Sequence, residues 1–230
     1  MSIPQTQAAV QLQTDFLSAS DAARLVMRTG ITQVLRLMSE AIEADFMRWQ
    51  DFDKSARTAA HSASGVIELM PVADAQDYAF KYVNGHPHNP QRGLPTVMAF
   101  GALADVATGM PRFVSELTLT TALRTAATSA MAAKHLARKD NRSMALIGNG
   151  SQSEFQALAF MELLGVRELR LFDIDPAASQ KLLRNLQPFL AQFSARVSIA
   201  ASAGDAVKDA DIVTTATADK TRATIIQAPL

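Results

Sequence analysis

Cysteine is absent from this chain of 230 residues. Disulfide bonds, zinc sites built on thiolates and cysteine nucleophiles are therefore excluded. An excess of charge of one sign is also lacking, because 22 lysines and arginines balance 22 aspartates and glutamates. No basic stripe or run stands out, so the sequence does not favour nucleic acid as a partner.

Long apolar runs are missing as well. No run approaches the roughly 18 residues that a membrane span requires, so we expect no membrane partner. The N-terminus from Met1 to Gln7 is polar and lacks the charged and apolar segments of a secretory signal. A soluble cytoplasmic protein is therefore expected. Hydrophobic residues make up 48% of the chain, enough for a substantial core in one large domain or two ordinary ones.

The first half of the chain reads as helices followed by antiparallel sheet. Residues 1–17 show no pattern, and Ser20 can cap a short helix that runs to Met27. Residues 31–49 have the apolar spacing of a stronger helix, and the pattern then fades over 51–64. Strands separated by turn residues are expected after that stretch, at 66–72, 78–84, 96–103 and 110–115.

The second half alternates helices with short apolar strands, after a long helix expected over 117–137. The expected strands are 144–147, 168–172, 195–200, 211–214 and 223–226, with helices at 152–164, 176–187 and 204–208 between them. Such alternation favours a parallel sheet with helices on both faces. The fold class is therefore α/β, with a Rossmann-type nucleotide-binding domain over 117–230. A domain of helices and antiparallel sheet is expected over 1–116.

The most informative segment is Met144–Phe155, where an apolar strand breaks at Gly148 and Gly150 and a helical pattern follows. A second strand then ends on Asp173. This order is the layout of a mononucleotide-binding βαβ unit, in which bare amides and a helix N-terminus receive a pyrophosphate. Asp173 lies about 23 residues after Gly150, close to the roughly 20 expected for a ribose-binding carboxylate. Ser153 stands in place of the third glycine, and a turn that binds nothing is the alternative.

Three basic residues, Arg57, Lys81 and Arg124, stand in unusually apolar or small-residue surroundings. A cation in such a setting needs a counter-charge, which an acidic ligand can supply. For any one of them alone, an ordinary surface cation is the favoured interpretation. Glu68 lies within an apolar strand, where it either faces solvent or serves a site. The two histidines of 86–88 lack a third ligand, so we predict a polar loop there and no metal site.

Six segments in combination resemble the ornithine cyclodeaminase/μ-crystallin family. These segments are Phe52–Arg57, Gly65–Pro71, Phe80–Pro87, Glu116–Thr118, Ala122–Thr128 and Gly148–Phe155. The likeness runs from about Phe46 to the end of the sequence and keeps the order of the motifs. It implies that the first domain binds the substrate and forms the dimer. In dimers of the family two such sheets pair to close a barrel, so a homodimer is expected.

The resemblance also implies a reaction, the NAD-dependent conversion of L-ornithine to L-proline and ammonia. NAD takes a hydride from Cα, the δ-amine attacks the resulting imine, ammonia leaves, and the same cofactor reduces the cyclic imine. By matching motifs, Arg57, Lys81 and Arg124 hold the substrate carboxylate, and Glu68 helps to place an amine. The residues implied at the cofactor are Thr96, Arg124, Gly148, Gly150, Ser151, Gln152, Asp173 and Thr217.

One part of the family's site finds no match in this sequence. The family's catalytic aspartate follows a strand beyond Leu230, and Asp219 is not its equivalent. We therefore expect an N-terminal portion of an enzyme, without the C-terminal return of the substrate domain and inactive on its own. Lysine cyclodeamination, ketimine reduction and amino-acid dehydrogenation share the same carboxylate clamp and remain alternatives. A non-catalytic protein that binds NAD or a small ligand is an alternative from another class.

Overall fold

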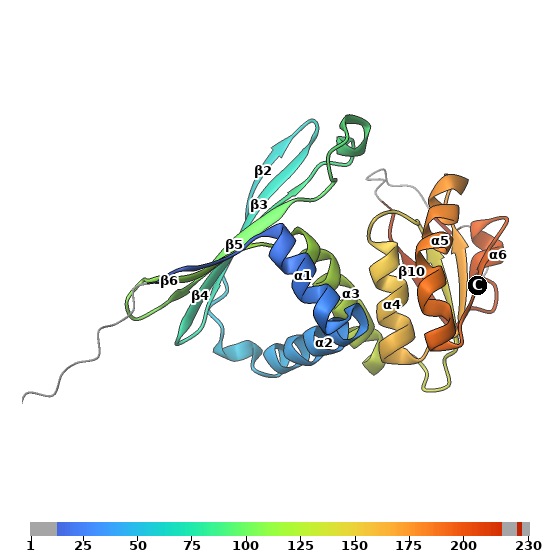
Figure 1. The fold of residues 1–230 in the computed structure, drawn as a ribbon, viewed down its shortest axis with the longest axis horizontal. Helices are drawn as coiled ribbons and strands as arrows, with labels where there is room; N and C mark the ends of the chain where they lie inside the picture. The colour runs from blue at the N-terminus through green and yellow to red at the C-terminus, as the bar shows by residue number, and fades with distance from the viewer. Residues whose placement is uncertain (1–12, 218–224, 227–230) are drawn as a thin grey trace, which may run out of the picture.

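The computed structural model describes residues 13–217, 225 and 226, and it contains two sheets joined by helices (Figure 1). The first sheet has six strands in the order β1-β6-β5-β4-β3-β2, and the second has four in the order β10-β7-β8-β9. The connecting helices are α1 (Ala19–Thr29), α2 (Ile31–Met47) and α3 (Thr118–Leu136). The predicted α/β class, with an antiparallel sheet preceding a parallel one, is confirmed.

Helix α1 begins with a capping box. The N–H of Asp21 donates to the Ser18 hydroxyl (3.2 Å), and the N–H of Ser18 donates to the Asp21 carboxylate (3.3 Å). Two otherwise unpaired donors are thereby satisfied, so Ser18 caps this helix and the prediction of Ser20 was wrong. The helix expected over 31–49 is confirmed as α2, which is followed by the short 3₁₀ turn η1 (Trp49–Asp51).

The six-stranded sheet contains β1 (Asp15–Leu17), β2 (Thr58–Ser62), β3 (Gly65–Ala73), β4 (Asp77–Gly85), β5 (Ala99–Asp105) and β6 (Pro111–Glu116). Its neighbouring strands are antiparallel except β1, which lies parallel to β6. The four predicted strands are confirmed with small shifts, but β1 and β2 fall in stretches where no pattern was expected. Every residue of β2 is exposed at the sheet edge, so no alternation of apolar and polar side chains marks it.

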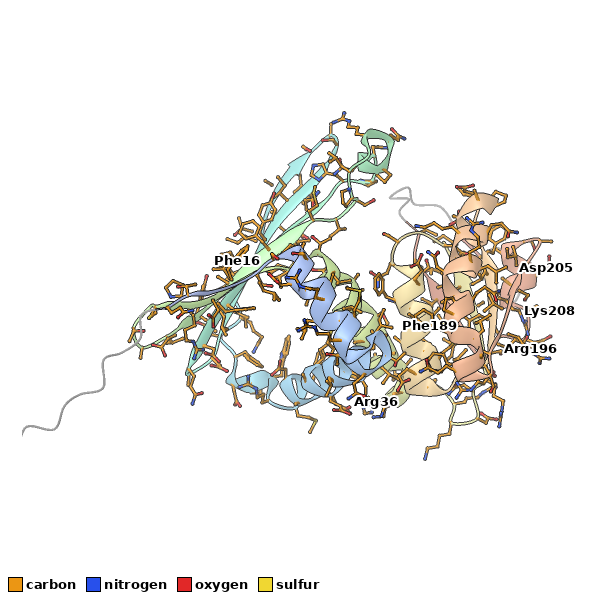
Figure 2. The ribbon with its side chains drawn as sticks, viewed as in Figure 1. Phe16, Arg36, Phe189, Arg196, Asp205 and Lys208 are labelled. Atoms are coloured by element: carbon orange, nitrogen blue, oxygen red, sulfur yellow. The ribbon has the colours of Figure 1, made fainter. Side chains whose placement is uncertain are left out.

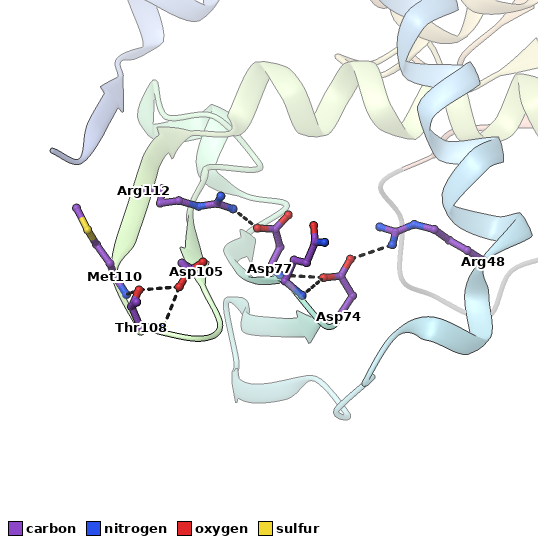
Figure 3. Close-up of polar contacts among 8 residues, drawn as sticks. Arg48, Asp74, Asp77, Asp105, Thr108, Met110 and Arg112 are labelled. Atoms are coloured by element: carbon purple, nitrogen blue, oxygen red, sulfur yellow. Dashed lines mark hydrogen bonds and ion pairs between the residues drawn. The ribbon is translucent and has the colours of Figure 1, made fainter. Parts of the chain in front are cut away.

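Carboxylates fix the turns at one end of this sheet (Figure 3). Asp74 accepts a hydrogen bond from the N–H of Asp77 (2.8 Å) and another from Arg48 Nη1 (2.9 Å). The second bond ties the end of α2 to the β3–β4 turn. Arg112 forms an ion pair with Asp77, and Asp105 accepts hydrogen bonds within the β5–β6 turn. Together these contacts set the register of the two hairpins.

The two faces of this sheet differ in what covers them. Strand alternation places Leu69, Tyr82 and Phe100 on one face, and Phe16 of β1 continues it. Tyr82 stacks on Phe100 with ring centroids 4.9 Å apart, yet Phe100 is 47% exposed and Phe16 is 69% exposed (Figure 2). This face therefore presents uncovered aromatic and aliphatic side chains. The opposite face carries Lys81.

The parallel sheet contains β7 (Ser143–Ile147), β8 (Glu168–Phe172), β9 (Arg196–Ile199) and β10 (Ile212–Thr215), joined by α4 (Ser153–Leu164), α5 (Pro176–Phe193) and α6 (Ala203–Val207). Counted along the chain, its spatial order is 3-2-1-4, as in the first part of a Rossmann sheet. Apolar side chains of α4 and α5 cover one face, and those of α6 cover the other. Of the strand expected at 223–226, residues 223 and 224 lie outside the described part of the chain, and the described residues 225 and 226 belong to no strand.

Helix α5 runs beyond residue 187, where the helix was expected to end, and it includes Pro188. Its last turn is held by Phe193, a buried side chain of the core.

At the start of β10, the Asp211 carboxylate accepts from the N–H of Arg142 (2.9 Å) and from the N–H of Ser143 (2.9 Å). These N–H groups, with the Ser143 hydroxyl, hold the pKa of Asp211 well below its usual range. The carboxylate thereby locks β10 beside β7.

The helices of the first half dock onto the helix layer of the parallel sheet. Leu35 of α2 is fully buried in the same apolar cluster as Leu123 of α3 and Leu158 of α4. Arg36 of α2, labelled in Figure 2, forms an ion pair with Glu162 of α4 beside this contact. Helix α3 is thereby fixed between the two sheets.

Candidate functional site

The half-buried Lys81 of β4 lies opposite Met70 of β3 and Gly101 of β5. Its side chain lines a largely apolar cavity of about 380 Å³ on the helix side of the sheet. The pKa of Lys81 is lowered to about 8, mainly by burial and then by the charges of Arg124 and Arg57, against the opposing effect of Glu68. The ammonium therefore lacks a sufficient negative counter-charge, and the carboxylate of a ligand can provide one.

Arg124 of α3 belongs to the same electrostatic cluster. Burial lowers the pKa of its guanidinium, and Arg57 adds to the effect. Neither Lys81 nor Arg124 donates a side-chain hydrogen bond to any residue within the described part of the chain. The structure thus brings the three predicted cations together, with the donors of two of them available to a ligand.

Arg57 and Glu68 form an ion pair at the rim of this cluster, with 3.1 Å between Nη1 and Oε1. Glu68 pairs with Val83, two residues from Lys81, so Glu68 and Lys81 lie on the same face of the sheet. The Arg57 side chain is 60% exposed. Ion pairs of this kind contribute only about 0–1 kcal/mol, so a bound carboxylate can compete for the guanidinium.

The glycine turn after β7 closely approaches the end of β10. Gly148 has a φ of +86°, and a Cβ at this position would lie 2.8 Å from the main-chain carbon of Ala216. Only glycine fits such a contact. Strand order reverses between β7 and β10, which is the place where ligands bind in open parallel sheets. Gly150 has no atom within 4 Å of a Cβ, so a ligand can approach its main chain.

Asp173 stands next to this turn at the end of β8. Its carboxylate accepts hydrogen bonds from the N–H of Asn149 (2.6 Å) and from the N–H of Asp175 (2.9 Å). A carboxylate accepts about four hydrogen bonds, so capacity for two ribose hydroxyls remains. Sequence reasoning missed Asn149, whose buried amide bonds the Leu146 carbonyl (3.0 Å) and the Ser179 hydroxyl (3.0 Å) and so braces the turn.

The other predicted cofactor residues border the same turn or lie in a separate segment. Ser151 is exposed, and Gln152 donates from Nε2 to the Ala122 carbonyl (3.0 Å) of α3. This bond ties the glycine turn to the helix that carries Arg124. Thr217 follows the last residues of β10, next to Gly148. The geometry gives no contact of Thr96 with this turn, so its role stays a prediction.

The strand expected from Thr96 begins only at Ala99. The reason is a side chain, because Asn84 Oδ1 accepts the hydrogen bond of the Met98 N–H (2.6 Å) where a main-chain carbonyl is usual. Asn84 Nδ2 also meets His86 Nδ1 at 3.0 Å. Sequence reasoning missed both roles, because an Asn-Gly-His-Pro run signals only a turn.

Two findings concern other kinds of site. Among residues 13–217, 225 and 226, no group of three or more histidines, aspartates or glutamates is placed to hold a metal ion. None of the helices in these residues has the length and hydrophobicity of a membrane span.

Comparisons with known proteins agree with this geometry. A model of the ornithine cyclodeaminase/mu-crystallin family matches residues 20–230. An ornithine cyclodeaminase from Brucella abortus biovar 1 (strain 9-941) is 56% identical over 213 residues, which cover 92% of this chain and 58% of the relative. The chain thus spans less than two thirds of that relative's length.

Two solved structures share the fold. A lysine cyclodeaminase, studied for recognition of L-lysine, L-ornithine and L-2,4-diaminobutyric acid, has a TM-score of 0.85 and 28% identity, covering 94% of this chain and 64% of its own. A Δ1-pyrroline-2-carboxylate reductase from Thermococcus litoralis, in complex with NADH and L-proline, has a TM-score of 0.77 and 30% identity. That alignment covers 88% of this chain and 61% of the reductase.

Proposed function

Because the chain belongs to the ornithine cyclodeaminase/mu-crystallin family, we propose that it is the substrate- and cofactor-binding portion of an ornithine cyclodeaminase. The reaction is the release of ammonia from L-ornithine with formation of L-proline, and the enzyme class is an NAD-dependent lyase. The observation that carries this proposal is the cluster of Arg57, Lys81 and Arg124, in which burial and the charges of the two arginines lower the pKa of Lys81.

The described residues fit NAD. The switch point between β7 and β10 offers the Gly148–Gly150 main chain for the pyrophosphate, and Asp173 has acceptor capacity for the ribose. Ser151, Gln152 and Thr217 border the same turn, and we assign Thr96 and Arg124 to the nicotinamide end. Bound NAD would supply a hydride acceptor for Cα of the amino acid and, once reduced, a hydride donor for the cyclic imine.

The protein's own groups account for the orientation of the amino acid. Lys81 and Arg124 donate to the substrate carboxylate from inside the site, and Arg57 closes over it from the rim. Glu68, held at 3.1 Å from Arg57, accepts from a substrate amine. Each bound charge then has an opposite partner, which offsets the cost of burying Lys81 and Arg124.

The identity to the Brucella relative favours ornithine over lysine as the substrate, because the lysine cyclodeaminase is only half as similar in sequence. We place the substrate domain at 1–116 and the nucleotide domain at 117–230, supported by the passage from β6 to α3 at Thr118. A cytoplasmic location belongs to the same proposal, and cell fractionation tests it.

The uncovered face of the six-stranded sheet supports a homodimer. Phe16, Leu69 and Phe100 are exposed there. Full burial of an exposed side chain of this kind contributes about 1.5–3 kcal/mol, so covering the exposed parts of these three with a second copy favours association. Sedimentation equilibrium tests this point. Replacement of Phe100 by Glu is expected to shift a dimer toward monomer, and an unchanged mass contradicts the proposed surface.

Calorimetric titration of the purified chain with L-ornithine, L-lysine and putrescine, in the presence of NADH, tests the function. We expect ornithine to bind most tightly and putrescine, which lacks a carboxylate, to bind at least about tenfold more weakly. Tighter binding of lysine favours a lysine cyclodeaminase. Equal binding of putrescine contradicts the carboxylate clamp.

A further inference from the structure

Asn84 occupies an unusual position where β4 and β5 part. Its own N–H donates to the Met98 carbonyl (3.1 Å), as in a regular antiparallel pair. The return bond comes from the Met98 N–H to the Asn84 side chain, at 2.6 Å from Oδ1. The side chain thus replaces its own main-chain carbonyl. Asn84 is only 6% exposed, so the exchange is buried.

The pairing continues in register after this exchange. His86 donates from its N–H to the Thr96 carbonyl (2.9 Å), while the His86 carbonyl accepts from Asn89 and so leaves the ladder for the turn η2 (Asn89–Arg92). The segment Thr96–Met98 is therefore held at one end by Asn84 of β4 and at the other by His86, which directly follows β4. In Figure 1 it lies at the end of the sheet that is nearer to the four-stranded sheet.

The bond between Asn84 and His86 has one consistent arrangement of protons. Oδ1 of Asn84 must face the Met98 N–H, so Nδ2 is the atom that meets His86 Nδ1 at 3.0 Å. An amide nitrogen only donates, so Nδ1 accepts and the neutral imidazole carries its proton on Nε2. The ring also packs against Gly65, where a Cβ would lie 2.7 Å from its Cγ. Hydrogen bonding and packing therefore fix the imidazole together.

From this geometry we propose that Asn84, with the His86 ring as its partner, is a positioning residue that sets Thr96 at the nicotinamide end of the cofactor site. The proposal rests on the proposed function through the assignment of Thr96. Loss of the Asn84 side chain frees the Met98 N–H, and loss of the His86 ring frees the Asn84 amide that accepts from this N–H. In either case the Met98 end of the segment is no longer fixed, and Thr96 is held only through its main-chain bond from His86.

The test uses NADH titration of the full chain, followed by fluorescence, with four variants. Asn84→Ala and His86→Ala are each expected to weaken NADH binding about tenfold. His86→Asn should stay within about twofold of the unmodified chain, because its amide oxygen lies near the place of Nδ1 and accepts from Asn84. Asn185→Ala is the matched control, since this asparagine bonds Glu154 on α4, in the helix layer of the parallel sheet.

A double-mutant cycle separates positioning from a general loss of structure. In a Thr96→Ala background, Asn84→Ala should add less than about twofold, because its effect acts through Thr96. An effect of Asn84→Ala that persists undiminished in that background overturns the proposal. Binding within about twofold of the unmodified chain for both Asn84→Ala and His86→Ala also overturns it.

Amide hydrogen exchange gives a readout that does not need the cofactor. The Met98 N–H should exchange at least about tenfold faster in His86→Ala, while the Leu146 N–H in β7 keeps its rate. Unchanged protection of Met98 overturns the proposal even if Asn84→Ala fails to fold. An unmodified chain that does not bind NADH instead contradicts the proposed function, so the two failures are distinguishable.

Discussion

Replacement of Lys81 by methionine should weaken the binding of L-ornithine while leaving NADH binding unchanged. Lys81 is the half-buried cation of β4, and its ammonium is one of three groups assigned to the substrate carboxylate. Hydrogen bonds to charged groups contribute about 1.5–3 kcal/mol each, which corresponds to a loss of roughly tenfold to hundredfold in affinity. Calorimetry with L-ornithine at pH 7 measures the loss, and fluorescence titration with NADH provides the comparison.

The same substitution should not lower the stability of the free protein. Folding lowers the pKa of Lys81 from 10.5 to about 8, so between these values the unfolded chain binds more protons than the folded one. Stability then rises with pH across this window, and below pH 8 the full cost of the buried charge is present. Lys81→Met removes that cost, so at pH 7 the variant should unfold at the same or a higher denaturant concentration. The difference in stability between the variant and the unmodified chain should become smaller from about pH 8 to pH 10.5.

The exposed Lys181 of α5 offers the matched control. Lys181→Met removes the same charge outside the cluster and should change neither ornithine affinity nor the pH dependence of stability. Two results would rule out the role of Lys81 as a buried cation that binds the substrate carboxylate. One is ornithine affinity within about twofold of the unmodified chain, and the other is a clear loss of stability at pH 7.

Three further substitutions test other parts of the structure. Gly148→Ala should both destabilise the chain and abolish NADH binding, because at a φ of +86° its Cβ would lie 2.8 Å from the main-chain carbon of Ala216. An unchanged midpoint of thermal unfolding contradicts this prediction. Because the Asp173 carboxylate repels the 2′-phosphate of NADP, we predict that the chain binds NAD more tightly than NADP. Asp173→Ala should weaken NAD binding about tenfold and reduce this preference, and titration that finds equal affinities in the unmodified chain rejects the ribose assignment. Asp211→Ala should lower the free energy of unfolding by about 2–3 kcal/mol at pH 7. Because the folded-state pKa of Asp211 is lowered, its contribution is full above the unfolded pKa of about 3.9 and is lost on acidification through the folded pKa, so urea titrations of the two proteins should converge at low pH.

Periodic and punctuated segments were predictable from the sequence. Helix α2 follows from apolar spacing, and the turn at Gly148 follows from glycines between two apolar strands. The edge strands β1 and β2 were not predictable, because three residues or five exposed ones carry no alternation. Their pairing is decided by long-range contacts with β6 and β3.

In the candidate site too, local sequence predicted some features, while others depend on contacts between distant segments. Local composition singled out Arg57, Lys81 and Arg124, but their mutual effect on pKa depends on how β4, α3 and the segment before β2 come together. The role of Asn84 was hidden for another reason. A side chain that replaces a main-chain carbonyl leaves no periodic trace in the sequence, and it also explains why β5 starts later than expected.

A crystal structure of the chain with NADH and L-ornithine shows where the substrate carboxylate binds. We predict the ornithine carboxylate within about 2.7–3.2 Å of Lys81 Nζ and of the Arg124 guanidinium, and the pyrophosphate against the Gly148–Gly150 main chain. A carboxylate bound elsewhere, with Lys81 and Arg124 left without an anionic partner, would rule out the carboxylate clamp.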